Sequence, residues 1–508
     1  MGEPIREIRV ETNNVFDLDS PGESLPPFHW ANAVHIRTKE KVIRRELLFS
    51  EGDPYDPDLL QETERNLRGL PFIRKAEVIG VETSSGPVVI VRTWDAWTLE
   101  VTASFSRAGG VNQTKAGIAD GNVLGRGKTT SLLYQGSGPT VERSIAYSDP
   151  QLLDRHVRYD MLAGESSQAR HYMLSIARPF YSSLTKSSFS GGGHYAEDRT
   201  TVYQGTSQAG TVGRRAYDAD VTYGYALQAS TRRTNRLTLG LVTDHADYSA
   251  LPDATTLFVP DAEQHTALQL GLDYQELDFI KARRIQKLSR EEDFNMGLAV
   301  SPSIGYAPPW QALGTTGARL TPKIEVRKGF STELGQIVLL RGDYSSAYVN
   351  GGNGMRLATA DLQYYCRYYP RHTVAAHLAF DHGWRLDEPS LLSLGEDTGL
   401  RGYRAGQFQG NRRLLMTAED RIFLFDNLFK LVDGGAVVFF DSGYAWMPEQ
   451  AFTFGDLKSS YGVGLRLAAS RSSDNEPVRI DLAHALNDNN FPSRWTVSIQ
   501  AGRAFGSN

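Results

Sequence analysis

The residues of this chain that could do chemistry are a group of arginines and the acids that follow them. Arg401, Arg404, Arg412 and Arg413 lie in the Gly-rich stretch GLRGYRAGQFQGNRRLLMTAEDR, residues 399–421, which leads directly into a strand-like pattern. An arginine guanidinium is a planar fork that can bridge two carboxylates, which lysine does less well. An arginine of this stretch could therefore fix a loop by ion pairs; the alternative is a solvated surface arginine.

Two acids on the following segments are candidate acceptors. In TAEDR, Glu419 shares a strand face with Arg421, and in VVFFDSG, Asp441 shares one with Phe439 and Gly443. Because alternate residues of a strand point to the same face, both carboxylates can point inward from neighbouring strands. Removing one partner of such a contact would cost about 3–5 kcal/mol in a dry interior. In a wet interior the cost would be nearer ~1 kcal/mol.

Strands must position these residues, because the hydrophobic period after Trp94 is two. YGVGLRL (461–467) and PVRIDLAHA (477–485) each have one apolar or aromatic face and one face of Gly, polar or charged residues. A two-sheet sandwich would alternate in the same way. A barrel is favoured because the pattern recurs with little helix, aromatics lie near strand ends, and the polar face carries Arg and Asp that could pair across a lumen.

The length of the alternating region sets the expected size of this barrel. Dividing residues 96–508 into units of roughly 25 residues predicts an all-β transmembrane barrel of about 16 antiparallel strands. Composition agrees: the chain has 48 Gly, 23 Tyr, 22 Phe and 7 Trp but only 22% charged residues. This balance is typical of many strands with Gly-rich turns and aromatic belts.

Hydropathy does not separate a soluble chain from a barrel. No window approaches the roughly 18 apolar residues of a membrane-spanning helix, and the mean hydropathy is -0.37. Only every second residue of a barrel strand faces lipid, so a transmembrane barrel would give similar values. The start MGEPIREIRV has no charged-then-apolar leader, and we expect the numbering to begin at a mature end.

Charge and motifs argue against several function classes. The net charge of -5 gives no cationic field for nucleic acid, so we expect no nucleic-acid partner. Cys366 is the single cysteine, which excludes an intramolecular disulfide and a multi-cysteine metal site. No G-x-S-x-G motif or Ser/His pair stands out, so we expect no enzyme, no catalytic residues, no cofactor and no metal.

Residues 1–95 predict a separate small α+β domain with the order β-α-α-β-β. TKEKVIRRELLFSEGDPY (38–55) places Val42, Ile43 and Leu47 on one helical face, and a second helical pattern follows in DPDLLQETERNLRGLP (56–71). Two strand-like runs close the domain.

The stretch VIRRELLFSEGDPYDPDLLQETERNLRGLPFIRKAEV resembles the helix-turn-helix-strand signature of a single POTRA domain, the polypeptide-transport-associated module of the Omp85 superfamily of BamA- and TamA-like proteins. An insertion near 13–30 departs from a minimal module. The resemblance implies that this domain lies in the periplasm of a Gram-negative-type bacterium and that residues 96–508 form an Omp85-type transmembrane β-barrel in its outer membrane.

Further motifs carry the same resemblance through the barrel region. LRGY (400–403) resembles the Arg-Gly-Tyr/Phe motif of the inward-folded loop six of Omp85 barrels, and TAEDR and VVFFDSG resemble the paired strand motifs. DGNVLGRGK (120–128) resembles a tight periplasmic turn, although an ordinary Asn/Gly turn would read alike, and the last strand resembles a C-terminal β-signal. The resemblance implies a loop lock with these residues: Arg401, Gly402, Tyr403, Glu419, Asp441 and Gly443.

The expected function follows from a seam between the first and last barrel strands. A closed barrel has no free edge unless one seam is weak, and an opened seam would template a client strand. The expected lateral seam residues are Leu99, Val101, Ile499, Gln500, Gly502 and Phe505.

The resemblance implies an outer-membrane insertase that assembles unfolded β-barrel clients in the lipid bilayer. The alternative in the same superfamily is a translocation pore for a secreted polypeptide. Periplasmic chaperones and accessory lipoproteins are further partners compatible with either role. The sequence leaves insertion and secretion open.

Overall fold

The computed structural model describes residues 3–501 except 85, 109–110, 138–139, 205–206, 251–261, 311–314, 316, 387–390, 473–474 and 490. The chain divides into two compact units. One contains residues 1–231, 236–270 and 305–319, and the other contains residues 232–235, 271–304 and 320–508. Among the described residues, no helix is both long and apolar enough to cross a membrane.

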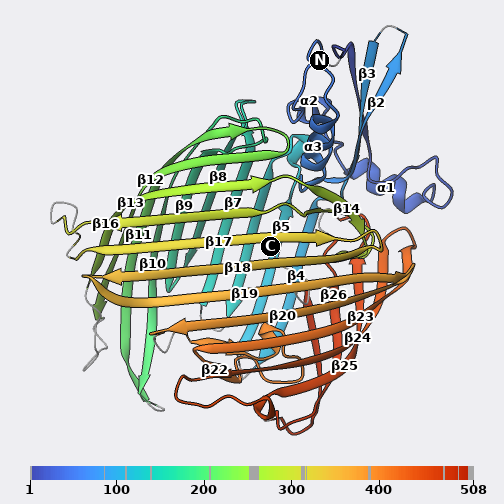
Figure 1. Ribbon diagram of the computed structural model, residues 1–508. Coiled ribbons are helices and arrows are strands. Elements are labelled where there is room, and N and C mark those ends of the chain that lie inside the picture. Colours follow the sequence, from blue (N-terminus) through green and yellow to red (C-terminus); the bar gives the residue numbers. More distant parts are fainter. Residues whose placement is uncertain are drawn as a thin grey trace. The chain divides into compact units, whose positions relative to one another are not determined.

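An N-terminal α+β module precedes the barrel strands in the first unit (Figure 1). Its elements are β1 (Glu7–Asn13), α1 (Pro26–Val34), α2 (Glu40–Arg44), α3 (Pro57–Arg68), β2 (Ile73–Thr83) and β3 (Gly86–Asp95). The sheet order is β1-β3-β2, with β1 parallel and β2 antiparallel to β3. Helix α3 begins where the Asp56 side chain accepts a hydrogen bond from the Asp58 N–H, which is an N-cap. Its residues Leu60 and Leu67 reach the core beneath the sheet.

The module differs from the predicted β-α-α-β-β order by one additional helix, α1 (Pro26–Val34), which begins in the 13–30 insertion and extends beyond it. Pro26 and Pro27 begin this helix, because proline fits the first helical turn, where its missing N–H is not needed. Phe28 of α1 packs with Val15 and Phe16 in a small cluster of its own. The insertion near 13–30 therefore contains the start of a helix.

Twenty described strands form a closed barrel, in which chain neighbours pair except where a short hairpin intervenes. In chain order the barrel strands are β4 (Leu99–Ala108), β5 (Val111–Asp120), β6 (Thr129–Ser137), β7 (Thr140–Leu152), β8 (Val157–Ser166), β9 (Ala169–Arg178), β10 (Ser187–Gln204), β11 (Ser207–Ala229), β12 (Arg233–Ala250), β13 (Glu263–Glu276), β16 (Ala299–Ala307), β17 (Arg319–Ser331), β18 (Gln336–Val349), β19 (Gly352–Tyr369), β20 (His372–Trp384), β23 (Arg412–Leu428), β24 (Val432–Trp446), β25 (Lys458–Ala469), β26 (Val478–Ala485) and β27 (Trp495–Ala501).

The prediction of about 16 strands is therefore wrong in number, although the all-β barrel itself is confirmed. The error comes from the turns, which are shorter than the roughly 25-residue spacing assumes. Strands β18 and β19, for example, are joined by Asn350 and Gly351 alone, and both have positive φ as a tight hairpin turn requires.

Two small hairpins lie outside the barrel ladder, both in the second unit. Strands β14 (Phe279–Arg283) and β15 (Glu291–Asn295) pair between β13 and β16, and strands β21 (Leu392–Leu394) and β22 (Phe408–Gly410) pair between β20 and β23. With short 3-10 turns at Val123–Gly125, Glu396–Thr398 and Phe454–Asp456, they complete the described elements. The β21–β22 hairpin is the segment that carries the cationic loop.

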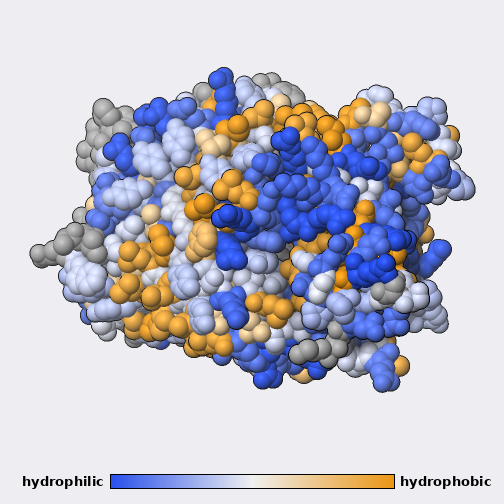
Figure 2. Space-filling view, turned by 90° about the horizontal axis from the view of Figure 1, so that it is seen from above, coloured by the Kyte–Doolittle hydropathy of each residue, from blue (hydrophilic) through white to orange (hydrophobic). Residues whose placement is uncertain are grey.

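Barrel strands expose apolar side chains on one face and bury polar ones on the other. On β24, Val438 and Phe440 are exposed while Phe439 and Asp441 are buried. In Figure 2, one face of the molecule carries hydrophobic residues interspersed with hydrophilic ones. An exposed apolar face and a buried polar face invert the pattern of a soluble sheet and suit strands whose outer face meets lipid.

The N-terminal module and barrel turns of the first unit share specific hydrogen bonds. Asn122, in the predicted 120–128 turn, donates from Nδ2 to Thr38 Oγ1 at 2.8 Å. In the β7–β8 turn, the Asp154 carboxylate forms ion pairs with Lys41 at 2.6 Å and with Arg45 at 2.8 Å. The segment 120–128, which resembles a tight periplasmic turn, thus also contacts the N-terminal module.

Candidate functional site: a buried arginine lock

The loop between β20 and β23 folds so that its tip is buried. Leu394, Leu400 and Tyr403 are each 0% exposed and pack against Leu415 and Ala485. Apolar burial of this kind removes surface from water and holds the loop tip.

Two glycines let the loop backbone turn at its tip. Gly399 has a φ of 109° and Gly402 a φ of 89°, backbone conformations that residues with a Cβ rarely adopt. At Gly402 a Cβ would also lie 3.5 Å from that of Ala483 on β26. The loop tip therefore needs glycine for its bend and lies close to the wall.

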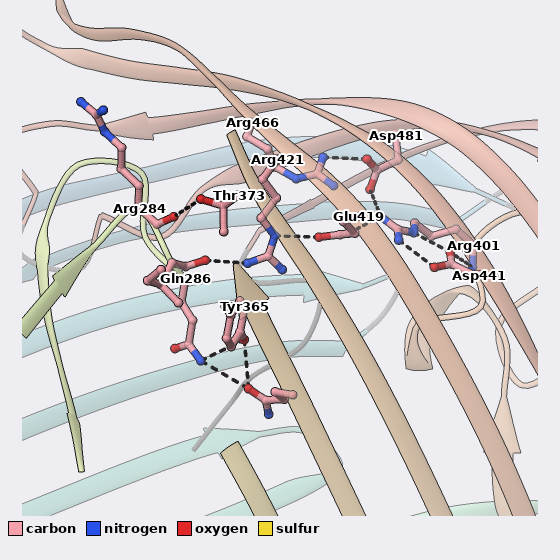
Figure 3. Close-up of polar contacts among 12 residues, drawn as sticks. Arg284, Gln286, Tyr365, Thr373, Arg401, Glu419, Arg421, Asp441, Arg466 and Asp481 are labelled. Atoms are coloured by element: carbon pink, nitrogen blue, oxygen red, sulfur yellow. Dashed lines mark hydrogen bonds and ion pairs between the residues drawn. The ribbon is translucent and has the colours of Figure 1, made fainter. Parts of the chain in front are cut away.

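Arg401 is brought together with both acids that the sequence suggested (Figure 3). Its Nε and Nη2 donate to the two carboxylate oxygens of Asp441 at 2.7 and 2.8 Å, and its Nη1 donates to Glu419 Oε1 at 2.8 Å. The exposed fractions are 4% for Arg401, 3% for Glu419 and 0% for Asp441. We call these three residues the arginine lock; it combines a bidentate and a single charge-assisted contact.

Two further residues complete the surroundings of Arg401. Asp481 on β26 has its Oδ2 3.9 Å from Arg401 Nη1, and the Phe439 ring centroid lies 3.5 Å from the guanidinium carbon. Gly462 pairs with Phe439 in the ladder, and a Cβ there would overlap the Phe439 ring. Sequence reasoning missed both roles. The alternation of each strand could have shown that Asp481 and Phe439 lie on an inward face, but it does not show which residue they contact.

Glu419 also joins the lock to the β14–β15 hairpin through a second arginine (Figure 3). Its Oε2 accepts from Arg421 Nε at 2.8 Å, and Arg421 Nη1 donates to the backbone oxygen of Ile285 at 2.7 Å. One carboxylate therefore serves a loop and a hairpin that enter from different connections of the barrel.

Tyr403 and Gly443 lie beside the lock without contacting the guanidinium in any recorded hydrogen bond. Tyr403 donates from its hydroxyl to the backbone oxygen of Ser459 at 2.8 Å and to Asn487 Oδ1 at 3.2 Å. At Gly443, a Cβ would lie 3.0 Å from the Leu394 side chain, so the missing side chain leaves room for the loop. Both residues position the loop.

The other arginines of the cationic stretch lie elsewhere. Arg404 stacks over Phe491 at 4.9 Å, and Arg413 pairs with Asp381 at 2.7 Å. Arg412 donates to His382 at 3.3 Å. Of the four, Arg401 is the one that makes the lock contacts.

The predicted seam residues are divided between the two units and the undescribed end. Leu99 and Val101 lie on β4. Ile499 and Gln500 lie on β27, and Gln500 accepts a hydrogen bond from Arg479. The remaining two, Gly502 and Phe505, lie outside the described residues.

Comparisons with known proteins add a local sequence match. No protein-family model matches the chain. A curated relative, the outer membrane protein assembly factor BamA of Neisseria meningitidis serogroup B (strain ATCC BAA-335 / MC58), is 26% identical over 156 residues. This match covers 29% of the chain and 19% of the relative, so the chain spans about a fifth of that protein's length.

Solved structures with some similarity include two Omp85 barrels. CdiB from Escherichia coli has 13% identity and a TM-score of 0.47, over 98% of this chain and 75% of that chain. BamA from Haemophilus ducreyi lacking POTRA domains 1–3 has 14% identity and a TM-score of 0.36, over 98% of this chain and 83% of that chain. Both TM-scores are low, so the assignment depends on the sequence match and the geometry. The local match to BamA and the arginine lock inside an all-β barrel support an Omp85-superfamily protein.

Proposed function

We propose that this protein is an outer-membrane insertase, which assembles β-barrel clients at a seam between its first and last barrel strands. Its N-terminal module would then be a single periplasmic POTRA domain spanning residues 1–95, followed by the barrel at 96–508. The observation that carries the proposal is the buried arginine lock on a chain with a local match to an assembly factor. The proposal assigns the protein no catalytic step.

The lock supports this role because it braces the wall beside the last strand. The loop tip contacts β23 through Glu419, β24 through Asp441 and β25 through the Ser459 backbone. It also approaches β26 through Asp481. Four successive strands held by one buried tip can keep their geometry while a neighbouring strand moves.

The last strand lies beyond the four strands that the loop tip contacts. In the barrel order β27 follows β26 and pairs with it from Trp495 to Ala501 over the described residues. Displacement of β27 would leave unpaired backbone groups that can template a client strand.

Exposed apolar side chains on the first and last barrel strands suit a position next to lipid. Val497 and Ile499 on β27 are 69% and 70% exposed, and Val101 on β4 is 74% exposed. Such residues would face the acyl chains of the bilayer, where a client strand leaves the seam.

Reconstitution into liposomes tests the proposal against secretion. Purified protein is incorporated into liposomes, an unfolded porin is added, and its folding is followed by heat-modifiable mobility on gels. The proposal expects faster porin folding than in empty liposomes. Passage of a partner polypeptide into the lumen without faster insertion would instead support a translocation pore, and no effect on folding would contradict the insertase role.

A further inference from the structure

A cavity lies where the β14–β15 hairpin meets the inner wall of the second unit. It is lined by backbone and side chains of the hairpin tip, residues 284–288, by the β19–β20 turn and by the inward faces of β23–β26. The charged residues of its lining are Arg284, Lys287, Arg371, Glu419, Arg421, Arg466 and Arg479. Figure 3 shows Arg421 beside Glu419 and Arg466 beside Asp481, while the guanidinium of Arg284 points away from them.

Two of these arginines have buried donor atoms with no acceptor. Arg466 is 8% exposed; its Nη1 donates to Asp481 Oδ1 at 2.6 Å, but its Nη2 has no hydrogen-bond partner. Arg479 is 9% exposed; it donates to Gln500 through Nη2, but its Nε has no partner. A buried charged donor without an acceptor is costly, so each such group calls for an explanation.

The charges along the cavity do not balance. The connected network pairs three guanidinium groups, those of Arg401, Arg421 and Arg466, with three carboxylates, those of Glu419, Asp441 and Asp481. Arg479 adds a fourth guanidinium, whose recorded partner is the uncharged amide of Gln500.

Two more arginines of the lining also meet uncharged acceptors. Arg284 donates to the backbone oxygen of Pro370 and Arg371 to that of Leu424. Asp426 offsets part of the charge of Arg284, and the buried Glu292 offsets part of the charge of Arg421. The lining therefore has an excess of positive charge around unsatisfied donors.

We propose that this cavity binds a small phosphate-class oxyanion, with Arg466 Nη2 and Arg479 Nε as its innermost donors. Guanidinium groups on different strands present donors in several directions, which suits a tetrahedral oxyanion, and a divalent charge matches the excess. Residues 284–288 of the hairpin tip line the same cavity as the wall arginines, so the bound anion fastens the hairpin to the wall.

The test measures thermal unfolding of the full-length protein in detergent with added sodium phosphate, against sodium chloride at matched ionic strength. The wild-type protein is expected to unfold at a higher temperature in phosphate, because a ligand that binds only the folded state stabilises it. Arg479→Gln should weaken phosphate binding at least about tenfold, the order expected when one charge-assisted contact is lost.

Arg327→Gln is the matched control, because Arg327 lies on β17, is half exposed and pairs with Glu325 away from the cavity. It should keep the full phosphate effect. If Arg479→Gln does not fold, Arg284→Gln takes its place, and calorimetric titration of the wild type with phosphate measures binding directly. Equal phosphate effects in cavity and control variants, or no heat of binding in the wild type, would overturn the proposal.

Discussion

Arg401 is the residue on which the loop depends, and its surroundings set what it contributes. Its guanidinium contacts two buried carboxylates and lies over the Phe439 ring, with little solvent access. In such a site the desolvation cost of each charge is balanced only while its partners remain. Removing the arginine leaves Glu419 and Asp441 close together and unpaired on this side.

Arg401→Ala is therefore expected to lower the free energy of unfolding by about 3–5 kcal/mol, the range for breaking a buried ion pair. Arg401→Lys should fall between this variant and the wild type, because an ammonium cannot reproduce the bidentate contact with Asp441. Denaturant unfolding followed by tryptophan fluorescence measures both. A loss below ~1 kcal/mol would mean that the lock is hydrated and weak.

A substitution at Gly464 on β25 tests the ion pair between Arg466 and Asp481, which lies next to the arginine lock. A Cβ at this position would overlap Asp481 Oδ1 and lie 2.6 Å from Arg466 Nη1, so Gly464→Ala should separate this ion pair. We expect a loss of about 3–5 kcal/mol, as for other broken buried pairs. Gly342→Ala on β18 is the control, because its nearest neighbour would be 3.9 Å away. Equal stability of the two variants would contradict this reading.

At this scale the sequence indicates which acids face inward but not all of the contacts. Strand alternation places Glu419 and Asp441 on inner faces, and the loop motif points to Arg401. The stacking of Phe439 depends on the space over Gly462, and the approach of Asp481 depends on how β26 is placed. Both are packing relations between strands, which a period of two does not encode.

At the scale of elements, the link between the N-terminal module and the β7–β8 turn depends on Asp154. Hydrogen bonds from Lys41 and then Arg45 lower the pKa of Asp154 below its ordinary value of 3.8. The folded-state pKa is below the unfolded one, so this contribution to stability is present above pH 3.8 and is lost as the pH falls through the lowered pKa.

Asp154→Asn should therefore unfold at a lower temperature than the wild type at pH 7, since it loses both cationic partners. The difference should shrink as the pH falls below 3.8. Thermal unfolding measured across pH values checks this, with Asp19→Asn, at an exposed position of the N-terminal module, as the control. A difference that does not depend on pH would rule out the ion pairs as its cause.

Glu46 in the same contact acts in the opposite direction. Burial raises its pKa, although the hydrogen bond from Gln151 partly counters this. A raised carboxyl pKa gives a contribution that is present at low pH and lost as the pH rises. Comparing Asp154→Asn with the wild type isolates the Asp154 contribution, because Glu46 is present in both proteins.

The sequence predicted elements with a strong local pattern and missed those whose pattern was weak or ambiguous. The α3 helix was predicted from its cap and its apolar spacing, and it spans Pro57–Arg68. Helix α1 was not predicted, and the two prolines that begin it occupy the first helical turn, where proline is tolerated. The β14–β15 hairpin lies where only alternation persisted, and alternation does not say whether a strand joins the barrel.

At the scale of the whole molecule, the sequence predicts an all-β barrel but overestimates the residues needed per strand. Period-two alternation identifies strands, whereas the length of each turn depends on local backbone choices such as the positive φ of Asn350 and Gly351. The position of the loop that carries Arg401 depends instead on long-range contacts, because Arg401 and its partner Asp441 are 40 residues apart in sequence.

The central claim is that the tip of this loop lies inside the barrel against the wall, and a disulfide tests it directly. A Cβ at Gly402 would lie 3.5 Å from the Ala483 Cβ, which is within the range of about 3.5–4.5 Å for disulfides. The test variant combines Gly402→Cys with Ala483→Cys in a Cys366→Ser background and is oxidised in intact membranes. The positive φ of Gly402 costs the variant about 1–2 kcal/mol.

The matched control is Gly406→Cys with Ala483→Cys, because Gly406 also has a positive φ but its nearest neighbour is Ser393. The account predicts a cross-link between positions 402 and 483, seen as a mobility shift that reductant reverses, and none between positions 406 and 483. Free thiols at 402 and 483 after oxidation, or equal cross-linking of both pairs, would contradict it.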